Sequence, residues 1–149
     1  MDDLRRMVTE LADREAIRQL VARYCHNVRQ RAHEEIADMY APDGVFDMPA
    51  NMAEGGVRSG REAIIQTFTD NNERMDPWPF THNHVIEMID ETHAKGFVYT
   101  EFRLGSQRMR TAFVGCYTDE YVKVDGDWKF HTRNLKSVNI PDPATLETA

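Results

Sequence analysis

The sequence has few cysteines, no long apolar run and a shortage of positive charge, and each lack excludes a class of protein. Its 149 residues include only 2 cysteines, and neither stands in a CxxC or a clustered His/Cys pattern, so no disulfide framework or zinc site is expected. An apolar stretch of about 18 residues is absent, which predicts no transmembrane helix, and the first residues lack the apolar segment of a signal peptide. Free thiols in a chain without an export signal predict a cytoplasmic location.

The charge balance and the missing sequence motifs exclude further kinds of binding partner and cofactor. The chain has 18 Lys and Arg against 25 Asp and Glu, and its net charge of -7 opposes binding to nucleic acid or to a membrane surface. It contains no GxGxxG, GxxxxGK[ST], GxSxG or HExxH, so we expect no cofactor, no metal and no serine-hydrolase chemistry. With 41% hydrophobic and 29% charged residues, the composition is that of a globular protein. We expect a single domain over residues 1–138 and a C-terminal tail over 139–149.

Helical periodicity dominates the first 75 residues. Apolar side chains recur at helical spacing in two groups, and Asp13 is a candidate N-cap for the second. A short helix is expected over His33–Ala41, ended by Pro42-Asp43-Gly44, and a capping-box pattern at Ser59–Glu62 predicts the start of another. The two apolar groups are Leu4, Met7, Val8 and Leu11, then Ile17, Leu20, Val21, Tyr24 and Val28.

The remaining sequence predicts strands. Val45–Met48 is a brief strand, while residues 49–58 and 71–79 are expected to be loops because they are rich in small residues, glycine or proline. Asp125-Gly126 favours a hairpin turn. Helices followed by a meander of strands predict an α+β fold with the helices on one face of a curved antiparallel sheet. The four longer predicted strands are Thr81–Ile89, Ala94–Arg103, Met109–Val124 and Trp128–Val138.

Several strings, taken in order, resemble one known superfamily. They are DREAI at 13–17 followed by Leu20 and Tyr24, YAPDGVFD at 40–47, GREAI at 60–64, NHVIE at 83–87 and DGDWKF at 125–130. Together they are similar to the nuclear-transport-factor-2-like superfamily, and most of all to its SnoaL-like and scytalone-dehydratase-like members.

The resemblance implies a cone-shaped α+β barrel, in which a curved antiparallel sheet wraps around a long N-terminal helix and encloses an apolar pocket. It also implies a homodimer or higher homo-oligomer formed through the sheet. Members of the superfamily include dehydratases, ketosteroid isomerases, polyketide cyclases, a dehydrochlorinase, non-catalytic binding modules and dioxygenase β subunits. Fold alone therefore leaves the function open.

The Asp–His pair typical of the superfamily's dehydratases is absent on an ungapped reading. Arg29 stands where the aspartate is usual, Ala32 occupies a second common acidic position, and Pro79 stands where the histidine is usual. We therefore consider His82 as the catalytic base, because the pKa of histidine lies near neutrality. The resemblance implies that Tyr24 contacts a substrate oxygen.

His82 and His84 are two residues apart on a predicted strand, so we expect them on one face. Three roles stay open for these two side chains: a catalytic base, two ligands of a metal ion, or histidines that are hydrogen-bonded or exposed and have no function in the site.

Five further residues are candidates for substrate binding. Trp78 and Phe80 offer rings that stack on a cyclic ligand, and Tyr99 and Tyr117 each belong to an alternating set on a predicted strand, one face of which lines the pocket. Asp47 replaces the missing carboxylate if it faces inward. Each also fits a structural role in the core or on the sheet surface.

These observations predict a cofactor-free lyase or isomerase of dehydratase type, acting on a small hydrophobic cyclic molecule with His82 and Tyr24 as its polar pair. Two alternatives stay open, a non-catalytic small-molecule-binding protein and a β-subunit-like structural partner of an oxygenase. Whether the protein is an enzyme is therefore not decided by the sequence.

Overall fold

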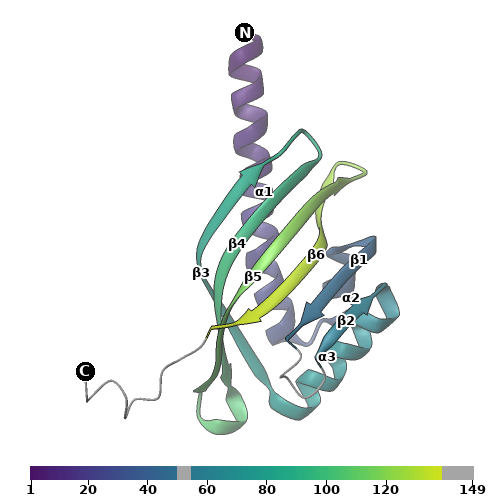
Figure 1. Cartoon of the computed structure of the whole chain (residues 1–149), viewed down its shortest axis with the longest axis vertical. Helices are drawn as coiled ribbons and strands as arrows, with labels where there is room; N and C mark the ends of the chain where they lie inside the picture. The colour runs from purple at the N-terminus through teal and green to yellow at the C-terminus, as the bar shows by residue number, and fades with distance from the viewer. Residues whose placement is uncertain (50–54, 139–149) are drawn as a thin grey trace, which may run out of the picture.

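A long helix, α1 (Asp2–Gln30), runs along the inner side of a curved 6-stranded sheet and projects beyond it at its N-terminal end (Figure 1). This computed structural model describes residues 1–49 and 55–138. The expected tail at 139–149 lies outside the described residues. The other elements are α2 (His33–Asp38), β1 (Tyr40–Met48), β2 (Gly56–Ser59), α3 (Arg61–Met75), β3 (Pro77–Met88), β4 (His93–Leu104), the 3-10 turn η1 (Gly105–Gln107), β5 (Arg110–Val124) and β6 (Asp127–Ser137).

The second apolar group of α1 forms its buried face. Ile17, Leu20, Val21, Tyr24 and Val28 are buried, as their helical spacing predicts. The prediction of a helix start at Asp13 is wrong, because α1 continues through this position. The Asp13 carboxylate instead accepts a 2.8 Å hydrogen bond from Trp128 Nε1 and pairs with Lys123 Nζ at 2.8 Å. It therefore ties the helix to the last hairpin.

The sheet has the strand order β2-β1-β6-β5-β4-β3. Every neighbouring pair is antiparallel except β1 and β6, which pair in parallel. The predicted α+β class is therefore confirmed, with a mixed sheet in place of a wholly antiparallel one. Parallel pairing at this point requires a long connection, and the chain between β1 and β6 supplies it. α2 and α3 lie beside β1 and β2, at the same end of the sheet (Figure 1).

Several predicted boundaries move because tertiary pairing overrides local turn signals. β1 begins at Tyr40, so Pro42-Asp43-Gly44 lies inside a strand whose register to β6 shifts between Tyr40 and Val45. The expected loop at 71–79 is instead the end of α3 and the start of β3. Of the other expected loop, 49–58, residues 50–54 lie outside the described residues and the last three belong to β2. No side chain caps α3, whose N-cap is Gly60 at φ 85°.

Bulges in two strands change which side chains face the helix. In β3, the pairing with β4 shifts between His82 and Val85, and Asn83 has φ 50°. In β6, Phe130 pairs with Tyr121 and Thr132 pairs with Glu120, which leaves His131 without an opposing residue. A bulge inserts one extra residue and so reverses the inward and outward alternation after it. Both reversals determine the composition of the site described below.

The core is dominated by aromatic rings around Tyr24. Its ring makes edge contacts with Phe68, Tyr117 and Phe130 at centroid distances of 5.7, 5.9 and 5.7 Å. Such edge-to-face pairs are each worth about 0.5–1.5 kcal/mol beyond the burial of area. No helix among residues 1–49 and 55–138 is long and apolar enough to cross a membrane.

Candidate functional site

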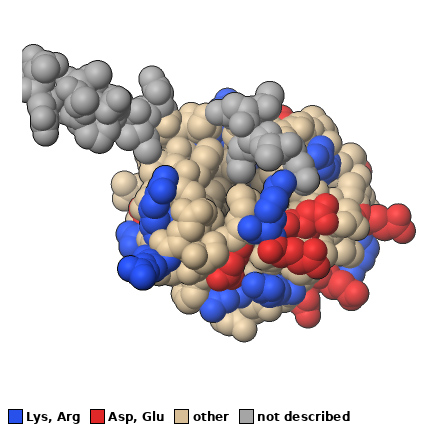
Figure 2. Space-filling model, turned by 90° about the horizontal axis from the view of Figure 1, so that it is seen from below, with Lys and Arg blue, Asp and Glu red and all other residues tan. Residues whose placement is uncertain are grey.

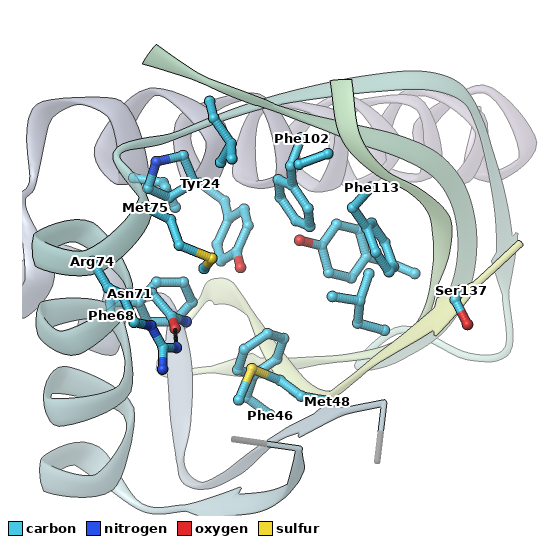
Figure 3. Close-up of a pocket in the computed structure, with 16 residues that line it drawn as sticks. Tyr24, Phe46, Met48, Phe68, Asn71, Arg74, Met75, Phe102, Phe113 and Ser137 are labelled. Carbon is cyan, nitrogen blue, oxygen red and sulfur yellow. Dashed lines mark hydrogen bonds between the residues drawn. The ribbon is translucent and has the colours of Figure 1, made fainter. Parts of the chain in front are cut away.

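A cavity of about 420 Å³ lies between α1, α3 and the concave face of the sheet. Most of its lining is apolar, with side chains from elements far apart in the sequence, and Figure 3 shows these rings and thioethers around the open space. A volume of this size is within the range of about 300–1,000 Å³ that holds small molecules. The main apolar lining residues are Phe46, Met48, Phe68, Phe102, Phe113 and Leu135.

Two tyrosine hydroxyls supply the buried polar groups of this cavity. Tyr24 is 1% exposed and its hydroxyl points into the open space in Figure 3, while Tyr117 is fully buried and also lines the cavity. Among the described residues, the side-chain neighbour of the Tyr117 hydroxyl is the hydroxyl of Tyr24, and the two make no well-formed hydrogen bond. Burial raises the pKa of Tyr24 to about 12 and the pKa of Tyr117 well above its ordinary value. Both are therefore neutral hydrogen-bond donors at physiological pH.

A buried cation lies behind the tyrosine pair. Arg133 is fully buried, and its guanidinium carbon lies 3.6 Å from the centre of the Tyr117 ring and 4.2 Å from that of Tyr24. It pairs with Asp119, also fully buried, with 3.2 Å between Nε and Oδ1. Arginine stays protonated in proteins, so a permanent positive charge lies directly beneath two cavity-lining rings.

A line of polar contacts leads from Asp119 toward the side of the sheet. Tyr121 donates its hydroxyl proton to Asp119 Oδ2 at 2.9 Å, and His84 Nε2 lies 3.0 Å from the same hydroxyl. Burial raises the pKa of Asp119 above its ordinary value, against the lowering effects of the Arg133 charge and the Tyr121 hydroxyl. Burial, then the charges of Arg133 and Arg18, lower the pKa of His84 to about 4.

The described lining of the cavity offers hydrogen-bond donors but no side chain that could act as a general base. Among the described residues, no histidine, aspartate or glutamate lines it, and no group of three or more His, Cys, Asp or Glu side chains suits a metal ion. The other polar lining residues are Asn71, Arg74 and Ser137, and Arg74 donates to Asn71 at 3.3 Å. Figure 2 shows the lower end of the molecule. Lys and Arg side chains flank an uncharged surface on one half of it, while Asp and Glu gather on the other half.

Residues 9–134 match the SnoaL-like domain. The chain belongs to this family. The match covers part or all of each element that forms the cavity, from α1 to β6, and ends just before the lining residues Leu135 and Ser137. No curated protein matches the sequence.

Solved structures show that the SnoaL-like chain has the fold expected from its sequence. An NTF2-like protein from Novosphingobium aromaticivorans has a TM-score of 0.81 at 17% identity, with 99% of this chain and 95% of that one covered. A scytalone dehydratase-like protein from the same organism has a TM-score of 0.75 at 23% identity, covering 89% of each chain. LinA type 2, a hexachlorocyclohexane dehydrochlorinase, has a TM-score of 0.74 at 19% identity, covering 91% and 97%. At these identities the likeness concerns the fold alone.

The predicted site residues are divided between the cavity and the outer face of the sheet. Tyr24 and Tyr117 line the cavity together. His82 does not, because it lies before the β3 bulge, where its side chain is 55% exposed and its Nε2 is 3.5 Å from Glu101. His84 follows the bulge and reaches the buried Tyr121, whereas His82 pairs with Glu101, yet both histidines line a smaller hollow of about 190 Å³ beside α1.

The other candidates also lie away from the lining of the cavity. Tyr99 is 45% and Phe80 is 39% exposed. The ring of Trp78 lies under the Arg29 guanidinium at 3.7 Å, so the arginine at the usual aspartate position covers this ring. Asp47 accepts a 3.1 Å hydrogen bond from Asn134, and it alternates with cavity-lining neighbours on β1.

Sequence reasoning missed Arg133 and Asp119. Regular alternation from Trp128 and Phe130 places Arg133 on the outer face, and only the bulge at His131 turns it inward. A signal was present, because Leu135 is out of phase with Trp128 and Phe130 when all three are read as one strand face.

Proposed function

We propose that this SnoaL-like protein binds a small, hydrophobic, ring-shaped molecule that carries an oxygen, and that this oxygen accepts hydrogen bonds from Tyr24 and Tyr117. The observation that carries the proposal is the Tyr117 hydroxyl, which is buried in the cavity lining with the Tyr24 hydroxyl as its side-chain neighbour, so that one of the two hydroxyl protons is left without an acceptor among the described residues. A buried polar group left unpaired costs about 1–3 kcal/mol, so an acceptor on a bound molecule stabilises the site. The apolar rings around it favour a ligand whose remaining surface is hydrophobic.

Lyase or isomerase chemistry is the second candidate. The SnoaL-like chain shares the NTF2-like fold with dehydratases and dehydrochlorinases, and its tyrosine pair supplies the acid that such reactions need. Arg133, 3.6 Å from the Tyr117 ring, favours negative charge developing on a ligand oxygen. Against this candidate, the described lining contains no base to remove a proton from carbon.

The binding proposal is tested by calorimetric titration with a panel of cyclic ketones and phenols. For a ligand that binds, Tyr24→Phe and Tyr117→Phe are expected to weaken affinity by roughly 3- to 10-fold each, the value of one hydrogen bond. Tyr99→Phe is the matched control, because this tyrosine is exposed on the outer face and its change leaves affinity unaltered. Equal affinity for all four proteins contradicts the role of the tyrosine pair.

The two candidates are separated by product analysis with the ligands that bind. Pure binding predicts no conversion of any of them. Conversion that Tyr24→Phe slows establishes the enzyme, and His82→Ala then shows whether the exposed histidine takes part. If no ligand binds and a larger chain copurifies, the β-subunit alternative replaces both.

A further inference from the structure

The first three turns of α1 carry an apolar stripe that no other described part of the chain covers. Leu4, Met7, Val8 and Leu11 are 61%, 58%, 57% and 63% exposed, and residues 1–12 are all exposed. Contact with the sheet begins at Asp13, so this segment extends about 18 Å beyond it at 1.5 Å per residue. Figure 1 shows the segment projecting beyond the strands.

The stripe is not a continuation of the buried face of the same helix. At about 100° per residue, its mean direction differs by roughly 130° from that of the buried set from Ile17 to Val28. A longer sheet in the same place would therefore not cover the stripe. Four large apolar side chains on a polar helix, aimed away from the chain's own core, indicate a surface that another molecule covers.

We propose that this stripe binds the same stripe of a second copy of the chain, with the two helices antiparallel. In this register Leu4 lies opposite Leu11 of the second copy, and Met7 lies opposite Val8. The stripe is thus complementary to itself about a two-fold axis, as a symmetric dimer requires.

The charges along the segment favour the antiparallel direction. Asp3 and Arg14 lie on the same flank of the stripe, so antiparallel pairing brings Asp3 of each copy beside Arg14 of the other. Within one chain, Arg14 pairs with Glu10 at 2.7 Å and donates to the Ile86 carbonyl at 2.7 Å, and Asp3 pairs with Arg6 at 2.8 Å, so the contact between copies adds to or replaces these pairs. Parallel pairing instead sets Asp2 and Asp3 beside their own copies and aligns the helix dipoles.

Because each helix contributes only three turns, the interface is smaller than the standard size of about 1,600 Å², and a dissociation constant in the micromolar range is expected. Sedimentation velocity of the full chain over roughly 1–200 µM measures it. A concentration-dependent dimer supports the proposal, and a monomer throughout this range overturns it.

Matched variants locate the interface. Leu4→Lys with Leu11→Lys is expected to weaken dimerisation by at least about tenfold without altering the helical circular dichroism, because both side chains are exposed in one chain. Val57→Lys, on a residue 61% exposed in β2, is the control and leaves the dimer intact. If Tyr99→Lys dissociates the dimer and the double variant does not, the outer sheet face is the interface and the proposal is wrong.

Cysteine cross-linking tests the direction of the helices. In an equimolar mixture of Leu4→Cys and Leu11→Cys chains, antiparallel pairing predicts a disulfide between positions 4 and 11, identified by peptide mass spectrometry. Each variant alone is expected to form no link between identical positions. A disulfide between two copies of position 4 demonstrates parallel pairing and overturns the antiparallel arrangement.

Discussion

The buried pair of Arg133 and Asp119 allows a quantitative prediction of stability. Both side chains are fully buried, and the pair lies behind the two tyrosines of the cavity. Asp119→Ala leaves a buried guanidinium without its counter-ion and removes the acceptor of the Tyr121 hydroxyl. Breaking a buried ion pair in this way costs about 3–5 kcal/mol. We therefore expect the free energy of unfolding to fall by that amount.

Urea titration followed by circular dichroism measures this loss. With a slope of about 2 kcal/mol/M, the midpoint is expected to move down by roughly 2 M. The control is Glu15→Ala, which removes an exposed pair of Glu15 and Arg18 at 3.8 Å and is expected to change stability by no more than about 0.5 kcal/mol.

A double variant distinguishes the ion pair from simple loss of packing. Asp119→Leu with Arg133→Met removes both charges and keeps most of the volume, so it is expected to recover more than half of the loss. A loss below about 1 kcal/mol in Asp119→Ala refutes the reasoning. The reasoning is also refuted if the double variant loses as much free energy of unfolding as the two single variants lose together, because the two charges then act independently.

Two further predictions concern groups around Tyr121. The pKa of His84 is lowered from 6.5 to about 4, so its ring is expected to titrate near pH 4 in an NMR titration. The stability that depends on neutral His84 is therefore complete above pH 6.5 and is lost as the pH falls toward 4. A midpoint near 6.5 would show that burial does not act on this ring. Gly96→Ala places a Cβ 2.4 Å from the Tyr121 hydroxyl oxygen, which Asp119 and His84 hold, and is expected to cost about 1–3 kcal/mol in urea titration. Unchanged stability would mean that the Tyr121 ring moves freely.

The helical part of the fold was predictable because its signals are local. The spacing from Ile17 to Val28 is enough to identify the buried face of α1, and Asp125-Gly126 marks the last hairpin, where both residues adopt positive φ. Tyr24 could be assigned to the inner face for the same reason. The parallel pairing of β1 with β6 was not predictable, because it joins segments more than 80 residues apart and leaves no local pattern.

The bulges in β3 and β6 limited how much of the site could be predicted. His82 was expected in the pocket and lies outside it, while Arg133 was passed over and lies in the core. Each bulge adds one residue, and one residue exchanges the two faces of every position that follows. Read without the bulges, the strands assign the wrong histidine to the inside and leave the buried cation on the surface.

The sequence by itself determined the fold class and the buried face of the long helix, because these depend on periodicity within short segments. Its resemblance to the superfamily implied the apolar pocket. The tertiary structure alone decided which polar groups meet. It placed Tyr24 and Tyr117 over Arg133 and Asp119, and it left His82 outside. The physical reason is that strand register and bulges depend on pairing between distant segments, and the direction of each side chain follows from that pairing.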